Sequence, residues 1–238
     1  LGLTEAEVSG ALLCLDVSEQ IVDEAIRKGC NLIVSHHPLL FRPVKTITDH
    51  DHVGRAIFKA IKNDITVYAA HTNLDSAQDG VAYKMAEKLG LQNIQWLSEK
   101  DTYTRGEVTL TAGEGIMATL PTSMTKREFM EHVKEVFRLK SLRVNNADKR
   151  KISRVALCGG SGSFLIPKAV EKKADAFITG EIGYHHFFGC EHDLLLMEIG
   201  HYESEQYTIE VLRDIITRFA PSLYVCKAET NTNPINYL

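Results

Sequence analysis

Short apolar runs that stop abruptly at histidine constrain the fold of this chain most strongly. The first, residues 31–35, ends in the adjacent imidazoles of His36 and His37, which Pro38 follows. On a continuing strand these two side chains would point to opposite faces of a sheet, so they can serve one site only where the chain leaves the sheet. Because proline cannot donate to a central ladder, Pro38 predicts that departure.

The same construction occurs twice more. A second apolar run, ITVYAA, predicts a buried strand that stops at His71, with Asp75 four residues later. A third run, LLLMEI, stops shortly before His201 and Glu205. Apolar residues then recur at helical spacing, so His201 and Glu205 are expected to share one face at the start of a helix.

Imidazole and carboxylate groups at three strand ends predict a metal site. These groups suit zinc, manganese, iron or nickel, and a set of His, His, Asp, His and Glu exceeds what one tetrahedral ion needs. A single strand-end histidine is more often a structural residue than a ligand, but three such patterns together argue for a shared site. We therefore expect two divalent ions per subunit, joined by a bridging carboxylate. A dinuclear centre activates bound water, so the expected chemistry is hydrolysis.

Strands and helices alternate along the first part of the chain. Residues 11–17 predict a strand, residues 19–28 a helix that Ser18 caps, and residues 31–35 the next strand, which makes a βαβ unit. Continuous apolar runs indicate parallel strands that are buried on both faces, with ligands at their carboxyl edge. Asp16 lies at this edge, where a helix-entry role explains it at least as well as a catalytic one.

The fold class expected is α/β, with two subdomains of largely parallel strands flanked by helices and the metal site in the cleft between them. Residues 1–97 form the first predicted domain and residues 119–238 the second. Residues 98–118 are charged and glycine-rich without a sustained period, so we interpret them as a linker.

A glycine-rich loop, GGSGS, connects a predicted strand at residues 152–158 to a helical segment. Glycines at a helix N-terminus can present backbone N–H groups to a phosphate or carboxylate. Gly160, Ser161 and Gly162 are therefore candidate substrate-binding residues. The loop lacks a Walker lysine and the full dinucleotide pattern, and a tight turn that needs positive φ explains it equally well.

Four segments of the chain resemble one family. SHHPLLF, YAAHTNLD, ITGEIGYHHFF and IGHYESEQ are together similar to the GTP cyclohydrolase 1 type 2 family, the YbgI-like or Nif-like dinuclear metal proteins, over nearly the whole chain. The resemblance implies that His36, His37, Asp75, His201 and Glu205 are the metal ligands, with Asp75 or Glu205 bridging. It also implies a ring-shaped homohexamer. Long members carry an inserted domain at residues 98–118, and this chain is too short to contain it.

The resemblance further implies which residues surround the ligands. His71 matches a position beside the site, and Glu181 and His185 match positions that line the cleft, so these three are candidates for proton transfer. GTP is the implied substrate, with the glycine-rich loop at its triphosphate. Because the sequence shows no arginine cluster near the site, an unidentified small phosphorylated or heterocyclic substrate fits nearly as well.

Composition narrows the class of protein. The 238 residues are 44% hydrophobic with a net charge of -4, and no basic stripe argues for nucleic acid. No apolar run approaches the roughly 18 residues of a membrane span. The five cysteines include no Cys-x-x-Cys pair, which fits free thiols in the cytoplasm. A metal-binding scaffold or regulatory interaction protein without turnover is the alternative to a hydrolase.

Overall fold

The computed structural model describes residues 1–238, apart from the side chains of residues 105 and 108, and it divides into two compact units. The first unit comprises Leu1–Thr72 and Thr208–Asn236, and the second comprises Asn73–Tyr207 and Tyr237–Leu238. This division differs from the predicted one at residues 98–118. The reason is that the C-terminal part of the chain returns to the first unit, a long-range pairing that no local sequence pattern encodes.

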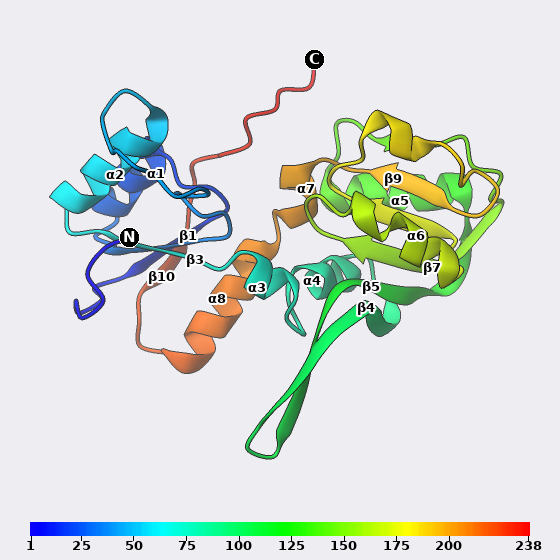
Figure 1. Ribbon diagram of the computed structural model, residues 1–238, viewed down its shortest axis with the longest axis horizontal. Coiled ribbons are helices and arrows are strands. Elements are labelled where there is room, and N and C mark those ends of the chain that lie inside the picture. The colour runs from blue at the N-terminus through cyan, green and yellow to red at the C-terminus, as the bar shows by residue number, and fades with distance from the viewer. The chain divides into compact units, whose positions relative to one another are not determined.

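The first unit is built on a parallel four-stranded sheet (Figure 1). The strand order is β10-β1-β2-β3, and each pair is parallel, as the continuous apolar runs predict. The strands are β1 (Ala11–Cys14), β2 (Leu32–Ser35), β3 (Thr66–Ala69) and β10 (Val225–Lys227). The helices are α1 (Glu19–Arg27), α2 (His52–Lys62) and α8 (Thr208–Phe219).

Side-chain caps fix where the first two helices begin. The Ser18 hydroxyl accepts the backbone N–H of Ile21 at the start of α1, and the Asp51 carboxylate accepts that of Gly54 at the start of α2. Such caps satisfy donors that have no partner within the helix. The apolar faces of these helices and strands then form one core, to which Leu12, Ile21, Val22, Ile33, Ala60 and Val67 belong. Each fully buried valine, leucine or isoleucine side chain stabilises the fold by about 1.5–3 kcal/mol.

The second unit contains a mixed six-stranded sheet with the order β4-β5-β7-β8-β9-β6. Its centre, β7 with β8 and β9, is parallel, while β4, β5 and β6 add antiparallel pairs. The strands are β4 (Gln92–Arg105), β5 (Val108–Thr125), β6 (Arg143–Val144), β7 (Lys151–Cys158), β8 (Ala176–Thr179) and β9 (Leu195–Glu198). The parallel centre places the ends of β7, β8 and β9 at one edge of this sheet.

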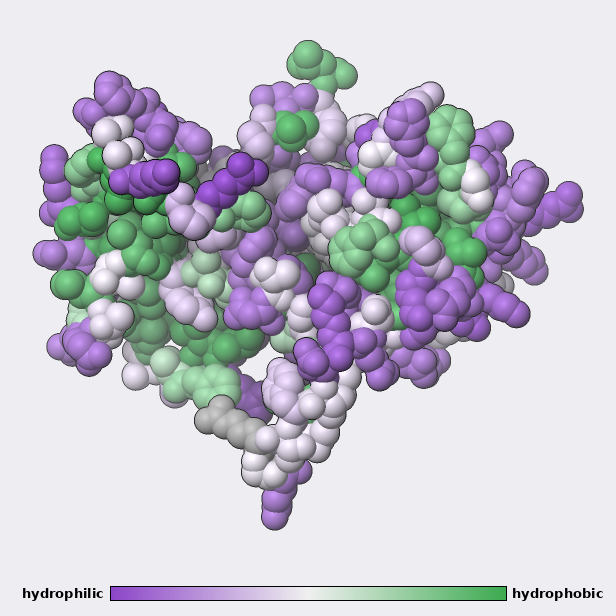
Figure 2. Space-filling view, viewed as in Figure 1, coloured by the Kyte–Doolittle hydropathy of each residue, from purple (hydrophilic) through white to green (hydrophobic). Residues whose placement is uncertain are grey.

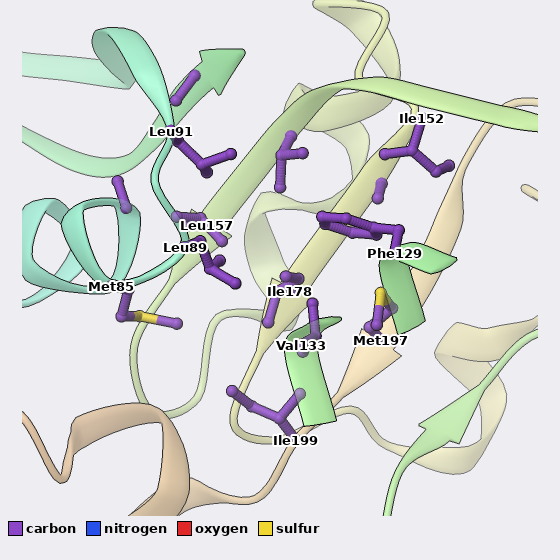
Figure 3. Packing of buried hydrophobic residues seen from close by; sticks show 14 of the residues in the cluster. Met85, Leu89, Leu91, Phe129, Val133, Ile152, Leu157, Ile178, Met197 and Ile199 are labelled. Carbon is purple, nitrogen blue, oxygen red and sulfur yellow. The ribbon is translucent and has the colours of Figure 1, made fainter. Parts of the chain in front are cut away.

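Helices cover the second sheet and supply much of its core. They are α4 (Val81–Lys88), α5 (Lys126–Phe137), α6 (Ile166–Glu171) and α7 (His201–Glu205), with α3 (Thr72–Asp75) before them and short 3-10 helices at Ser163–Leu165 and Tyr184–Phe187. Met85 of α4 and Phe129 of α5 pack with Ile178 and Met197 of the sheet (Figure 3). The capping box of Thr125 and Glu128 sets the start of α5.

The β4–β5 hairpin extends beyond the rest of its sheet (Figure 1). β5 pairs with β7 only from Ile116 onward, whereas β4 and β5 pair with each other along most of their length. Threonines face each other across the outer part, including Thr102 with Thr111, and this part is pale to purple in Figure 2. Residues 98–118, which the sequence suggested as a linker, therefore belong to two paired strands. Most side chains here are polar, and the apolar Tyr103 and Leu110 are exposed as well, so the sequence carries no sustained apolar period.

The structure also bears on the cysteines and on membrane-spanning segments. All five cysteines are free thiols in the structure. In the part of the chain that the structure describes, no helix combines the length and the apolar character needed to cross a membrane.

Candidate metal centre

Three imidazoles meet at the carboxyl ends of β2 and β3 in the first unit. His36 and His37 follow β2 directly, and His71 follows β3 after one residue. One ring nitrogen from each lies within 4.8 Å of the other two. The ring centroids of His36 and His37 are 4.9 Å apart. The structure thus brings these three predicted site residues together, and we call them the histidine triad.

The two adjacent imidazoles of the triad are both held through Nδ1. His36 Nδ1 lies 2.8 Å from the carbonyl oxygen of Ala70, and His37 Nδ1 lies 2.8 Å from Asp16 Oδ1. A carbonyl oxygen and an ionised carboxylate can only accept, so both rings donate Nδ1–H, and the neutral form of each ring has its lone pair on Nε2. Histidines that bind metals are usually oriented in this way. Asp16, whose role the sequence left open, is therefore a partner of a candidate ligand.

A second group of candidate ligands lies in the second unit, and we call it the carboxylate cluster. Helix α7 begins at His201 and ends at Glu205, and His201 Nε2 lies 3.2 Å from Glu205 Oε2. A carboxylate oxygen of Asp75 lies within 4.8 Å of one of Glu205. His201 Nδ1 lies 2.8 Å from Glu181 Oε1. The predicted helical spacing thus places His201 and Glu205 together, and Glu181 holds the ring of His201 from its other side.

Negative charge dominates the electrostatics of the carboxylate cluster. The hydrogen bond to Glu205 raises the pKa of His201 to about 9; burial opposes this change, and Glu181 adds to it. Burial raises the pKa of the nearby Cys158 thiol to about 12, and the charges of carboxylates, with Asp75 first among them, contribute to this rise. Neighbouring groups therefore favour positive charge at this position, as a cation-binding site requires.

Gly160 lets the backbone approach this cluster closely. Its φ is +56°, a left-handed conformation that suits glycine. A Cβ atom at this position would collide with Glu205 Oε1 and would lie 3.3 Å from His201 Nε2. The packing of two candidate ligands therefore requires glycine at position 160.

The protein itself uses the N–H groups of the glycine-rich loop that were expected to bind phosphate. Gly160 N–H donates to Ser204 Oγ at 2.9 Å, and Gly162 N–H donates to Thr179 Oγ1 at 2.9 Å. Ser161 is exposed. The tight-turn explanation fits Gly160, whose φ is positive, whereas Gly162 has a φ of -103°. Both hydrogen bonds would have to break before either N–H could bind a phosphate.

The three residues predicted to transfer protons have different surroundings. His71 belongs to the histidine triad, and Glu181 contacts His201. His185 is exposed in the 3-10 helix Tyr184–Phe187, where its ring lies 5.1 Å from that of Tyr184. Glu181 therefore contacts a candidate ligand, whereas the ring of His185 contacts that of Tyr184.

Comparison with known proteins gives consistent matches over the chain. Residues 1–234 match the family Duf34/NIF3 (NGG1p interacting factor 3). A relative from Clostridium acetobutylicum, named GTP cyclohydrolase 1 type 2 homolog, is 34% identical over 213 residues, which are 89% of this chain and 78% of that protein.

Solved structures agree with these sequence matches. Staphylococcus aureus protein SA1388 is similar with a TM-score of 0.89 and 30% identity, over 100% of this chain and 90% of that one. The protein ybgI, described as having unknown function, has a TM-score of 0.79 at 21% identity, over 96% and 87% of the two chains, and shares the fold.

Proposed function

This chain belongs to the Duf34/NIF3 family, and from that premise we propose that it is a metal-dependent hydrolase with a dinuclear centre. The ligands proposed are His36, His37, Asp75, His201 and Glu205, with Asp75 or Glu205 bridging two divalent ions. Zinc, manganese, iron and nickel all suit this set of imidazoles and carboxylates.

One observation carries this proposal. His36, His37 and His201 each have Nδ1 within 2.8 Å of an oxygen acceptor. Three imidazoles with the same ring nitrogen held would all direct Nε2 toward a ligand, which is the arrangement expected of histidines that bind metal. The close approach of Gly160 to Glu205 supports the same conclusion, because it leaves that carboxylate little freedom to move.

The residues of the chain have distinct roles in the proposed reaction. Bound ions would supply a water of lowered pKa as the nucleophile. Asp16 and Glu181 hold the rings of His37 and His201 in the orientation that ligation needs. His71, whose ring lies 5.4 Å from that of His36, is proposed to move a proton between the water and the substrate.

We propose that the substrate binds on the loop that follows Pro38. A pocket of about 300 Å³ lies there, and Leu40, Phe41, Arg42 and Val44 are among its lining residues. The Phe41 ring is 5.9 Å from that of His71, so a planar heterocycle against Phe41 would lie beside the triad. Arg42 offers positive charge for an acidic group of the substrate.

The chemistry of this loop favours a small anionic heterocycle. A nucleotide such as GTP belongs to this class, and the name of the Clostridium relative supports testing it first. Lys168 of α6 lies 3.0 Å from Glu171 in an ion pair, which offsets its charge. Arg42 and its loop neighbour Lys45 are therefore the stronger candidates.

The test is turnover by protein loaded with a defined metal. GTP is incubated with the wild type, with Glu205→Gln and with Phe41→Ala, and released formate is measured. Phe58→Ala is the matched control, because Phe58 is another exposed phenylalanine of the first unit. We expect turnover in the wild type and the control, none in Glu205→Gln and a raised KM in Phe41→Ala. Absence of formate and of ring-opened product from the wild type sinks the GTP assignment, and absence of metal-dependent turnover across nucleotides and heterocycles sinks the hydrolase.

The family description favours a second candidate function, because it names an interacting factor. In that case the chain would be a metal-binding scaffold or regulatory protein, and the ions would stabilise an interaction surface. Removing the metal separates the two candidates. An enzyme loses turnover and keeps its assembly, whereas a scaffold loses its assembly.

A further inference from the structure

The C-terminal segment of the first unit, residues 228–233, is tied to helix α1. The Glu24 carboxylate accepts the backbone N–H of Glu229 at 2.7 Å and that of Thr230 at 3.0 Å. It also accepts the hydroxyl of Thr230 at 2.6 Å. Glu24 itself is fully buried, so these bonds satisfy a carboxylate that would otherwise be costly to bury. The segment after β10 therefore has a fixed path.

Two residues further along this path, Thr232 meets Asp16. Thr232 Oγ1 donates to Asp16 Oδ2 at 2.9 Å, while Asp16 Oδ1 accepts from His37 Nδ1 at 2.8 Å. The two oxygens of one carboxylate thus have different partners. Rotation of the carboxylate would break both hydrogen bonds, so the Thr232 contact restricts the direction from which Asp16 holds His37.

We propose that Asp16 and Thr232 are positioning residues for the candidate ligand His37. Asp16 selects the Nδ1–H tautomer of His37 and fixes the direction of its ring, and Thr232 fixes the plane of the Asp16 carboxylate. The assignment deepens the proposed function and rests on it, because it gives the C-terminal segment a role in metal affinity. Removing an outer partner of a ligating histidine typically weakens metal binding about 10–100-fold.

Cobalt(II) titration of the full chain, followed by visible absorption, measures this effect. Asp16→Ala is expected to bind cobalt about 10–100-fold more weakly than the wild type. Thr232→Val should fall between the two, and Thr232→Ser, which keeps the hydroxyl, should restore wild-type affinity. Thr230→Val is the matched control, because Thr230 lies in the same segment and bonds Glu24 instead of Asp16. Asp16→Asn provides a second variant of the same shape if Asp16→Ala does not fold.

A second readout needs no metal. The ¹⁵N chemical shifts of the histidine rings report the tautomer of His37, which the spectrum of His37→Gln assigns. We expect Nδ1–H in the wild type and in Thr232→Ser, and a mixture of tautomers in Asp16→Ala.

The outcomes separate this proposal from the proposed function. An Nε2–H tautomer of His37 in the wild type overturns the role of Asp16, as does an unchanged tautomer in Asp16→Ala. Equal cobalt affinities of Thr232→Val and Thr230→Val overturn the role of Thr232. A wild type that binds no cobalt but shows the expected tautomers would contradict the metal function and leave the positioning of His37 supported.

Discussion

The two units hold their candidate ligands in different ways. The histidine triad combines three imidazoles at strand ends, and the acceptors for His36 and His37 come from segments that are distant in the sequence. The carboxylate cluster instead combines His201 and Glu205 from one short helix with Asp75. The triad is therefore built from imidazoles whose acceptors lie on distant segments, and the carboxylate cluster from two carboxylates and an imidazole, of which His201 and Glu205 share a helix.

This difference predicts how each group responds to a cation. Neutral imidazoles can lie together without a strong electrostatic cost. Carboxylates of Asp75 and Glu205 within 4.8 Å repel each other, and a divalent cation relieves that repulsion. Loss of metal should therefore affect the carboxylate cluster more than the triad, while loss of long-range support should affect the triad more.

The largest effect is expected when the long-range support of the first unit is removed by Glu24→Gln. Burial raises the pKa of Glu24, but hydrogen bonds from Thr230, Lys28 and two backbone N–H groups outweigh it and lower the pKa from 4.5 to about 2. This stabilisation is fully present above pH 4.5 and is lost as the pH falls toward 2. The shift corresponds to about 3 kcal/mol.

Urea unfolding of the wild type and Glu24→Gln at pH 7, 4.5 and 3 measures that difference. The two proteins should differ most at pH 7 and converge toward pH 3. Glu229→Gln is the control, because the Glu229 side chain is 81% exposed and its ion pair with Lys28 should contribute little. A difference in the free energy of unfolding that stays the same from pH 7 to pH 3 would contradict the stabilising role of the Glu24 carboxylate in the first unit.

The response of the carboxylate cluster to metal is the next effect in size. Zinc or manganese added to metal-free protein at 100 times its Kd should raise the free energy of unfolding by about 2.7 kcal/mol. Glu205→Gln should reduce this gain more than His37→Gln does, since it removes one of two repelling charges and a ligand. Thermal unfolding with and without metal gives the measurement. A larger loss of this gain in His37→Gln than in Glu205→Gln would contradict the proposed repulsion between the carboxylates.

The smallest expected effect on stability comes from a substitution that tests the role of Gly160. Gly160→Ala and Gly90→Ala both place a side chain at positive φ, +56° and +67°, and each should cost about 1 kcal/mol. A Cβ at Gly90 meets nothing within 4 Å, whereas one at Gly160 would collide with Glu205. Gly160→Ala should therefore lose at least as much stability as Gly90→Ala, and it alone should bind cobalt more weakly. Equal cobalt affinities would show that the close approach is unimportant for the ligands.

Local signals account for most of what the sequence could predict. The apolar runs before His36 and His201 contain strands β2 and β9, and the strand predicted at residues 152–158 is β7. The spacing of His201 and Glu205 gave their shared helix because helical periodicity is encoded within one turn. Parallel strands end at one edge of their sheet, so residues that follow such strands are expected to lie together even when no long-range contact is known.

Contacts between distant segments explain what the sequence could not predict. β10 pairs with β1 across most of the chain, so the first unit includes a strand that no local pattern assigns to it. Asp16 and Thr232 are 216 residues apart, and neither has a sequence context that indicates the other. The exposed threonines of the β4–β5 hairpin likewise carry no apolar alternation, which is why residues 98–118 suggested a linker.

The most direct test is the number of metal ions per chain, measured by mass spectrometry on gently purified protein. The wild type is measured beside Asp75→Ala, Glu205→Ala and His37→Gln, each checked for folding by circular dichroism. The account predicts about two ions in the wild type, as expected for a dinuclear centre, and zero or one in the variants. No stoichiometric metal in the wild type, even after zinc, manganese or iron is added, would contradict the dinuclear centre and leave only the fold.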